Sequence, residues 1–175
     1  GLFVIAHPGS VGDPVCSGCD WRFPDMMPGT ASAVEVWNGP WDCNSNNEKG
    51  LALWYGWLDA GHRVVATAGS DTHGPGEDWE RVGRSVVWSS GCTEEAILGA
   101  ISAGHLYASC GPTLELSAAS GGRVAMMGDT LAAGSAEIGV RWDGCPPGSF
   151  LRLVGTGGVL DEVRAGGGGT RRWEG

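Results

Sequence analysis

An apolar run, Val64-Val65-Ala66-Thr67, leads directly into the polar segment Ala68-Gly69-Ser70-Asp71-Thr72-His73. The apolar residues predict a buried strand, so the polar segment begins where that strand ends. Side chains at alternate positions of an extended chain point to the same side, which lets Asp71 and His73 enter one site together. A carboxylate beside an imidazole suits a divalent metal such as zinc, manganese or iron. The segment therefore predicts metal ligands at a strand end.

A further histidine follows an apolar run near the start of the chain. Leu2-Phe3-Val4-Ile5-Ala6 predicts a strand, and His7 comes directly after it. Residues 33–37 alternate as a third strand, which holds Glu35 and ends at Asn38. In a parallel sheet the carboxyl ends of the strands share one edge, where the chemistry of such sheets is found. We therefore expect His7 to join Asp71 and His73 as a metal ligand.

Helix and strand patterns alternate along the chain as far as residue 118. Helical spacing indicates helices at 46–60 and 93–104, the first ending at Gly61 and the second capped by Thr93. Apolar and alternating runs indicate strands at 2–6, 33–37, 63–68, 84–88, 106–109 and 113–117. This order predicts an α/β fold with a largely parallel sheet.

Beyond residue 118 the helical spacing disappears. Short apolar runs at 137–142, 149–154 and 159–163 lie between turns rich in glycine and proline. They predict the start of a small β-sandwich-like domain, with too few strands to close it. We therefore divide the chain into an α/β domain over residues 1–118, a partial β-rich domain over 119–165 and a Gly-rich tail over 166–175.

The charge balance excludes one class of partner. The chain carries a formal net charge of -9, with a pI near 4.7. Binding to a nucleic-acid backbone needs clustered lysine and arginine, which are absent apart from Arg171-Arg172. No segment approaches the ~20 consecutive apolar residues of a membrane span. We therefore expect a small-molecule substrate, and neither a nucleic acid nor a membrane as partner.

The cysteines allow two interpretations. Cys16-x-x-Cys19 has the spacing of a metal knuckle or a redox pair, but no second pair of this spacing accompanies it. The residues after Cys19 are typical of a loop, whereas a redox motif is followed by a helix. We favour loop thiols or a local disulfide over a zinc site, which remains the alternative. The chain has six cysteines in all: Cys16, Cys19, Cys43, Cys92, Cys110 and Cys145.

Several short motifs occur in a fixed order over residues 1–118. They are Ala6-His7-Pro8, Val34-Glu35-Val36-Trp37-Asn38-Gly39, Gly69-Ser70-Asp71-Thr72-His73, Thr93-Glu94-Glu95-Ala96-Ile97 and the segment from Tyr107 to Pro112. Together they resemble the C-terminal half of the PHP superfamily, named for polymerase and histidinol phosphatase domains. The carbaryl-hydrolase-like branch of metallohydrolases is the most similar.

The resemblance implies the C-terminal part of a distorted (β/α)7 barrel that holds two or three divalent ions, zinc, manganese or iron. It assigns His7 to one metal, Asp71 to another and His73 to a further one. Glu35 and Asn38 match positions with a supporting or substrate-binding role. The family's N-terminal His-x-His motif is absent, so the resemblance implies that the first half of the barrel lies upstream and that this chain alone is inactive.

A metal-dependent hydrolase is the function that these features predict. Asp71 would act as a catalytic residue by orienting a metal-activated water. The substrate would be a phosphoester or a small ester, carbamate or amide, among which the sequence does not decide. One alternative is a degenerate, non-catalytic binding or structural module. Another is a polymerase-associated phosphoesterase, which the acidic charge disfavours.

Overall fold

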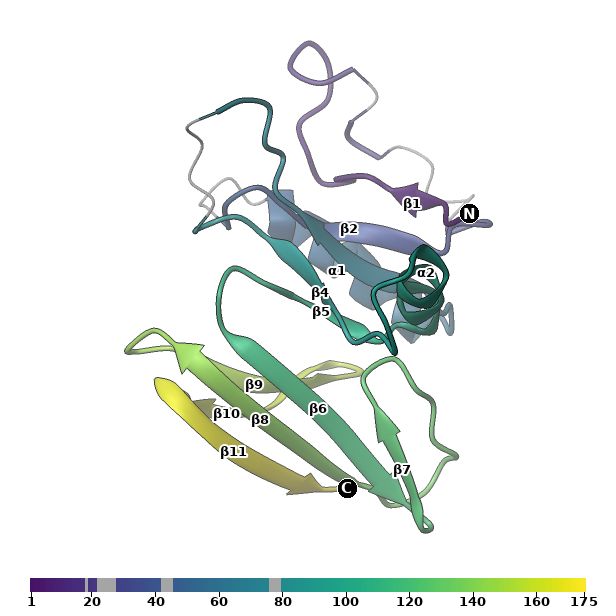
Figure 1. Cartoon of the computed structure of the whole chain (residues 1–175), viewed down its shortest axis with the longest axis vertical. Coiled ribbons are helices and arrows are strands. Elements are labelled where there is room, and N and C mark those ends of the chain that lie inside the picture. The colour runs from purple at the N-terminus through teal and green to yellow at the C-terminus, as the bar shows by residue number, and fades with distance from the viewer. Residues whose placement is uncertain (18, 22–27, 42–45, 76–79) are drawn as a thin grey trace. The chain divides into compact units, whose positions relative to one another are not determined.

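The computed structural model describes residues 1–17, 19–21, 28–41, 46–75 and 80–175. The chain divides into two compact units, Gly1–Cys110 and Gly111–Gly175. Figure 1 labels their helices and strands.

The predicted fold class, the C-terminal part of a (β/α)7 barrel in an α/β protein, is wrong. The described ranges contain far more strand than helix and only two helices, α1 (Asn46–Asp59) and α2 (Glu94–Ala103), with no barrel. A (β/α)7 barrel needs a helix between almost all successive strands. The segment after the first strand is instead rich in glycine and proline, which disfavour a helix, and its described residues form turns.

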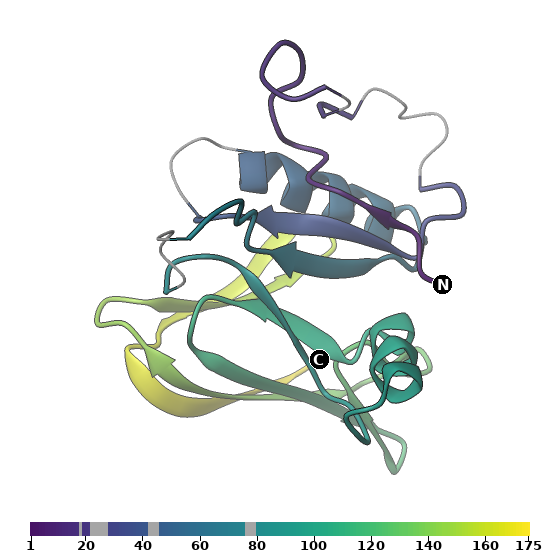
Figure 2. The ribbon, with the colours of Figure 1, turned by 45° about the horizontal axis from the view of Figure 1, so that its top comes forward.

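Three parallel strands form the central sheet of the first unit. They are β1 (Val4–Ile5), β2 (Ala33–Asn38) and β3 (Val65–Gly69), in the order β1-β2-β3. Val34 and Val36 of β2 pack with Ile5, Val64 and Trp57 on the side of α1. Figure 2 shows α1 running along this face of the sheet. The predicted strands at 33–37 and 63–68 and the helix at 46–60 are thus confirmed within a residue or two.

A two-stranded antiparallel sheet covers a second group of buried residues. It consists of β4 (Arg84–Val87) and β5 (Leu106–Ser109), and Leu106 packs against Ala33 and Val65 of the central sheet. The Ser85 hydroxyl bridges to β3, because it accepts from the Ala68 N–H at 2.9 Å and donates to the Ala68 carbonyl at 3.0 Å. This side-chain bridge fixes the position of β3 immediately before the Asp71 segment.

The ends of α2 follow the sequence prediction. The Thr93 hydroxyl accepts from the Ala96 N–H at 3.2 Å, so Thr93 is the N-cap. Gly104 ends the helix with φ 80, a left-handed conformation that glycine adopts without a steric penalty. Neither α1 nor α2 is long and apolar enough to cross a membrane.

The second unit, all of which is described, consists of β-strands only. One antiparallel sheet has the order β11-β8-β6-β7 and a hairpin forms a second sheet. Val140, Trp142 and Ala165 form the core. The strands are β6 (Thr113–Ser120), β7 (Arg123–Met126), β8 (Glu137–Cys145), β9 (Phe150–Gly155), β10 (Gly158–Arg164) and β11 (Gly167–Glu174).

Two segments of this unit differ from the assignment predicted from the sequence. Residues 113–118, assigned to the first domain, belong to β6, and most of the Gly-rich tail forms β11. Gly169 of β11 has a packing reason, because a Cβ at that position would lie 2.6 Å from the Trp142 ring. A glycine run that looks like a tail is here a strand lying against a large side chain.

Val140→Ala should lower the free energy of unfolding by about 2–3 kcal/mol, because it removes two buried carbon groups and leaves a cavity. Val140 is 5% exposed in β8. Val124→Ala is the matched control in the same sheet, since Val124 is 79% exposed and its truncation should change stability by less than about 0.5 kcal/mol. Urea unfolding of both variants measures the difference, and equal effects would contradict this core assignment.

Asp161→Asn should flatten the loss of stability in acid. Asp161 accepts from Trp173 Nε1 at 2.6 Å and from the Arg171 guanidinium at 3.0 Å, and these contacts hold the pKa of its carboxyl below the usual value. A lowered folded-state pKa gives stability that is present above the unfolded-state pKa and is lost as the pH falls through the folded-state pKa. Urea unfolding across acidic pH measures it, and parallel pH curves for both proteins would refute the linkage.

Candidate functional site

The carboxyl ends of the three parallel strands open into one pocket of the first unit. His7 follows β1, Asn38 ends β2, and Asp71 and His73 follow β3, and all four line the pocket. Its volume is about 960 Å³, near the upper end of the ~300–1,000 Å³ typical of small-molecule sites. The structure therefore brings these predicted residues to a common cavity.

Two residues of the pocket have an unusual backbone conformation. His7 has φ 26 and Asp71 has φ 53, and both therefore lie in the left-handed region that side chains other than glycine rarely adopt. Such conformations cost free energy and concentrate at functional sites, where the surrounding structure holds them in place. Of the residues predicted as metal ligands, two are thus held in strained conformations beside the pocket.

Glu35 joins the ends of the first two strands. Its Oε2 accepts a hydrogen bond from the His7 N–H at 2.9 Å and one from Asn38 Nδ2 at 3.4 Å. Gly69 makes room for this carboxylate, because a Cβ at that position would overlap Glu35 Oε1. Glu35 thus holds the His7 backbone and the Asn38 side chain at fixed positions.

Asn47 supports Asn38 from the first turn of α1. It is buried, accepts from the Asn38 N–H at 2.9 Å, and donates to the carbonyls of Asn38 and Pro40 at 3.3 Å. The sequence analysis did not single out Asn47. An asparagine near a helix start was the available signal, but it does not reveal which strand end the side chain contacts.

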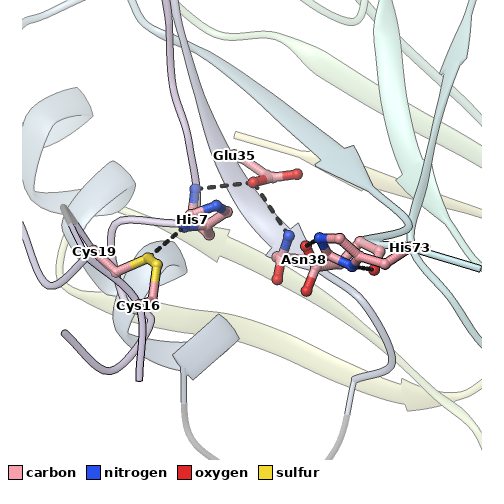
Figure 3. The surroundings of a disulfide bond; sticks show 7 residues. His7, Cys16, Cys19, Glu35, Asn38 and His73 are labelled. Atoms are coloured by element: carbon pink, nitrogen blue, oxygen red, sulfur yellow. Dashed lines mark hydrogen bonds and ion pairs between the residues drawn. A yellow bond between two sulfur atoms is a disulfide. The ribbon is translucent and has the colours of Figure 1, made fainter. Parts of the chain in front are cut away.

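The His7 ring lies against a disulfide. Cys16 and Cys19 are bonded to each other, and His7 Nδ1 is 3.3 Å from Cys19 Sγ. Figure 3 shows His7 between this disulfide and the Glu35 carboxylate. The local disulfide favoured by the sequence is present, but its contact with His7 was not predicted. Among the other cysteines, Cys92, Cys110 and Cys145 are free, and Cys43 lies outside the described residues.

Asp71 and His73 form a separate pair on the pocket wall. His73 Nδ1 lies 2.7 Å from the Asp71 carbonyl, and Nε2 lies 4.0 Å from Asp71 Oδ1. Since a carbonyl only accepts, Nδ1 carries a proton, and in the neutral ring Nε2 has the lone pair that a metal needs. The side chains are 80% and 49% exposed. Both can therefore be reached from solvent.

The described residues gather three ligating groups in one place, and they are not the predicted three. The donor atoms of His7, Cys16 and Cys19 all lie within 4.8 Å of one another. Asp71 and His73 share the pocket with His7 but are not part of such a cluster. A metal bound jointly by His7, Asp71 and His73 would therefore require movement of their side chains.

No known protein family, curated protein sequence or solved structure matches this chain.

Glu35→Ala should lower the free energy of unfolding by about 1–3 kcal/mol, because it leaves the His7 N–H and the Asn38 amide without their acceptor. Glu35→Gln should lower it less, since the remaining carbonyl oxygen can still accept from His7. Urea unfolding compares the two variants. Wild-type stability in Glu35→Ala would show that Glu35 does not hold these strand ends.

Proposed function

We propose that this pocket hydrolyses a small molecule with the help of divalent metal held by His7, Asp71 and His73. The observation that carries the proposal is the meeting of these residues and Asn38 on one pocket at the carboxyl ends of β1, β2 and β3. The motifs similar to those of PHP metallohydrolases support the same chemistry. The barrel of that family plays no part in the proposal. The proposal therefore departs from the resemblance in expecting this chain to be active by itself.

The donor groups fit zinc, manganese or iron. Imidazole nitrogens and a carboxylate oxygen are common ligands of these ions in hydrolases. The His73 tautomer presents Nε2 as a ligand, and the half-exposed Asp71 carboxylate retains access to a solvated ion. When bound, such an ion lowers the pKa of a coordinated water from about 15.7 to about 7.

The residues of the chain would then divide the remaining work. Asp71 would orient the attacking water as the catalytic residue, because its carboxylate lies on the pocket wall next to His73. The Asn38 amide would contact the substrate, since Glu35 holds this amide and Asn47 holds the Asn38 backbone at the pocket edge. Glu35 would position His7 through the His7 backbone.

The pocket lining favours a weakly charged substrate. The described lining residues include Val11, Val15, Pro40 and Val82, whose side chains are apolar. No lysine or arginine is among the described residues that line the pocket. A highly charged phosphate is usually bound by arginine or lysine. A small ester, carbamate or amide therefore fits the described lining better than a phosphomonoester.

Asp71→Asn should lower metal-dependent hydrolysis by at least about 100-fold, because it removes the charge and the proton acceptor that orient the water. The assay uses an aryl ester, an aryl carbamate, an aryl amide and an aryl phosphate, each with Zn²⁺, Mn²⁺ or Fe²⁺. Asp59→Asn is the matched control, since Asp59 is exposed at the end of α1. Circular dichroism checks that both variants are folded.

Two outcomes would overturn the proposal. One is undiminished hydrolysis by Asp71→Asn. The other is a folded wild-type chain that turns over none of the substrates with any of the metals, a result that would favour a non-catalytic binding module.

A further inference from the structure

The loop after β1 returns to His7 and is held there by its own backbone. The Trp21 N–H donates to the Pro8 carbonyl at 3.0 Å, which closes the loop next to His7. Within it, the Ser10 N–H donates to the His7 carbonyl at 3.0 Å and the Cys19 N–H donates to the Cys16 carbonyl at 3.3 Å. These backbone bonds hold the loop that places both cysteines beside the imidazole.

The side chains of Cys16, Cys19 and His7 are partly shielded from bulk water. Cys19 is 9% exposed, and Cys16 and His7 are partly buried. All three line the pocket, so a small ion can reach them. A cavity that admits an ion but shields its ligands from bulk water strengthens the electrostatic attraction between metal and thiolates.

We propose that the reduced chain binds one zinc ion through the thiolates of Cys16 and Cys19 and the imidazole of His7, and that formation of the Cys16–Cys19 disulfide releases it. The observation behind this proposal is the gathering of the three donor atoms within 4.8 Å. The site goes beyond the proposed function: it shares His7 with the proposed hydrolytic metal site but does not rest on Asp71 or His73.

The geometry needs only a local adjustment. Zinc–sulfur bonds of about 2.3 Å in a tetrahedron place two sulfur atoms about 3.8 Å apart. The Cα atoms of the cysteines are 5.4 Å apart, so rotation about their Cα–Cβ bonds can separate the sulfur atoms without a large backbone movement. Three protein ligands leave a fourth tetrahedral position for water or a pocket ligand.

The charges also balance at the site. Two thiolates neutralise one Zn²⁺, and His7 binds as a neutral imidazole, so the partly buried complex carries no net charge. Soft thiolates with imidazole select zinc over the harder ions manganese and magnesium.

The redox step requires a partner of stated chemistry. A dithiol reductant transfers two electrons and two protons to the Cys16–Cys19 bond and itself becomes a disulfide. Zinc binding then releases the two thiol protons as the Zn–S bonds form. A disulfide oxidant accepts two electrons from the thiolates and is cleaved to two thiolates of its own, which re-forms the Cys16–Cys19 bond. His7 is then the only remaining ligand of this set, and the ion dissociates.

Zinc titration of the whole 175-residue chain tests the proposal. One sample is reduced with a dithiol that is then removed without air, and the other stays oxidised. Competition with a chromophoric chelator should show one tight zinc equivalent in the reduced chain and an affinity lower by more than about tenfold in the oxidised chain, since even a lost supporting contact to a zinc ligand costs 10–100-fold. Co²⁺ in place of zinc should give a thiolate-to-cobalt absorption band only in the reduced chain.

Variants assign the ligands. Cys16→Ser with Cys19→Ser should abolish the cobalt–thiolate band, and His7→Ala should weaken zinc binding by more than about tenfold. Cys92→Ser is the matched control, because Cys92 is an exposed free cysteine outside the cluster. Asp71→Asn should leave the cobalt band unchanged, which separates this site from hydrolysis.

The outcomes decide between clear alternatives. Equal zinc affinity in the oxidised and reduced chains, or a band that survives the loss of both cysteines, would overturn the proposal. So would wild-type zinc affinity in a folded His7→Ala variant. If Asp71→Asn loses hydrolysis but keeps the cobalt band, both proposed sites are supported. If the wild-type chain gives the cobalt band but neither it nor any variant hydrolyses a substrate, only the zinc site is supported.

Discussion

The parallel pairing of β2 with β1 on one side and β3 on the other is the constraint on which the site depends. Parallel register brings the carboxyl ends of all three strands to one edge, with Asn38 directly opposite Gly69. Burial of Val34 and Val36 under α1 fixes which face of β2 is turned inward, because a slip of one residue would expose both. The polar strand ends can therefore be strained without loss of the sheet that presents them.

The sequence could predict elements but not how they are connected in space. Apolar periodicity and capping residues located β2, α1, α2 and most strands of the second unit, since these signals are local. The barrel prediction failed because motif similarity is also local, whereas a barrel requires parallel neighbours throughout. β4 and β5 flank α2 and yet pair antiparallel, and no sequence pattern around α2 distinguishes that arrangement from a parallel one.

In the candidate site, too, some features follow from local sequence patterns and others do not. The positions of Asp71 and His73 after β3 follow from the strand pattern, and their place on a pocket follows from parallel register. The contact between His7 and Cys19 and the bonds from Asn47 to Asn38 depend on how loops fold back. The left-handed φ of His7 has no signal in the sequence, because the steric preference of histidine alone would place it elsewhere.

His7 is held by two anchors that act on different parts of the residue. Glu35 binds its backbone N–H, and the disulfide lies against its ring. A change at the sulfur atoms can therefore alter the partner of the imidazole while the backbone stays fixed to β2. An imidazole nitrogen donates or coordinates but cannot do both, so a zinc ion held at Nδ1 by the two thiolates would leave the ring proton on Nε2. The proposed hydrolytic metal site and the proposed zinc site therefore share one side chain, that of His7.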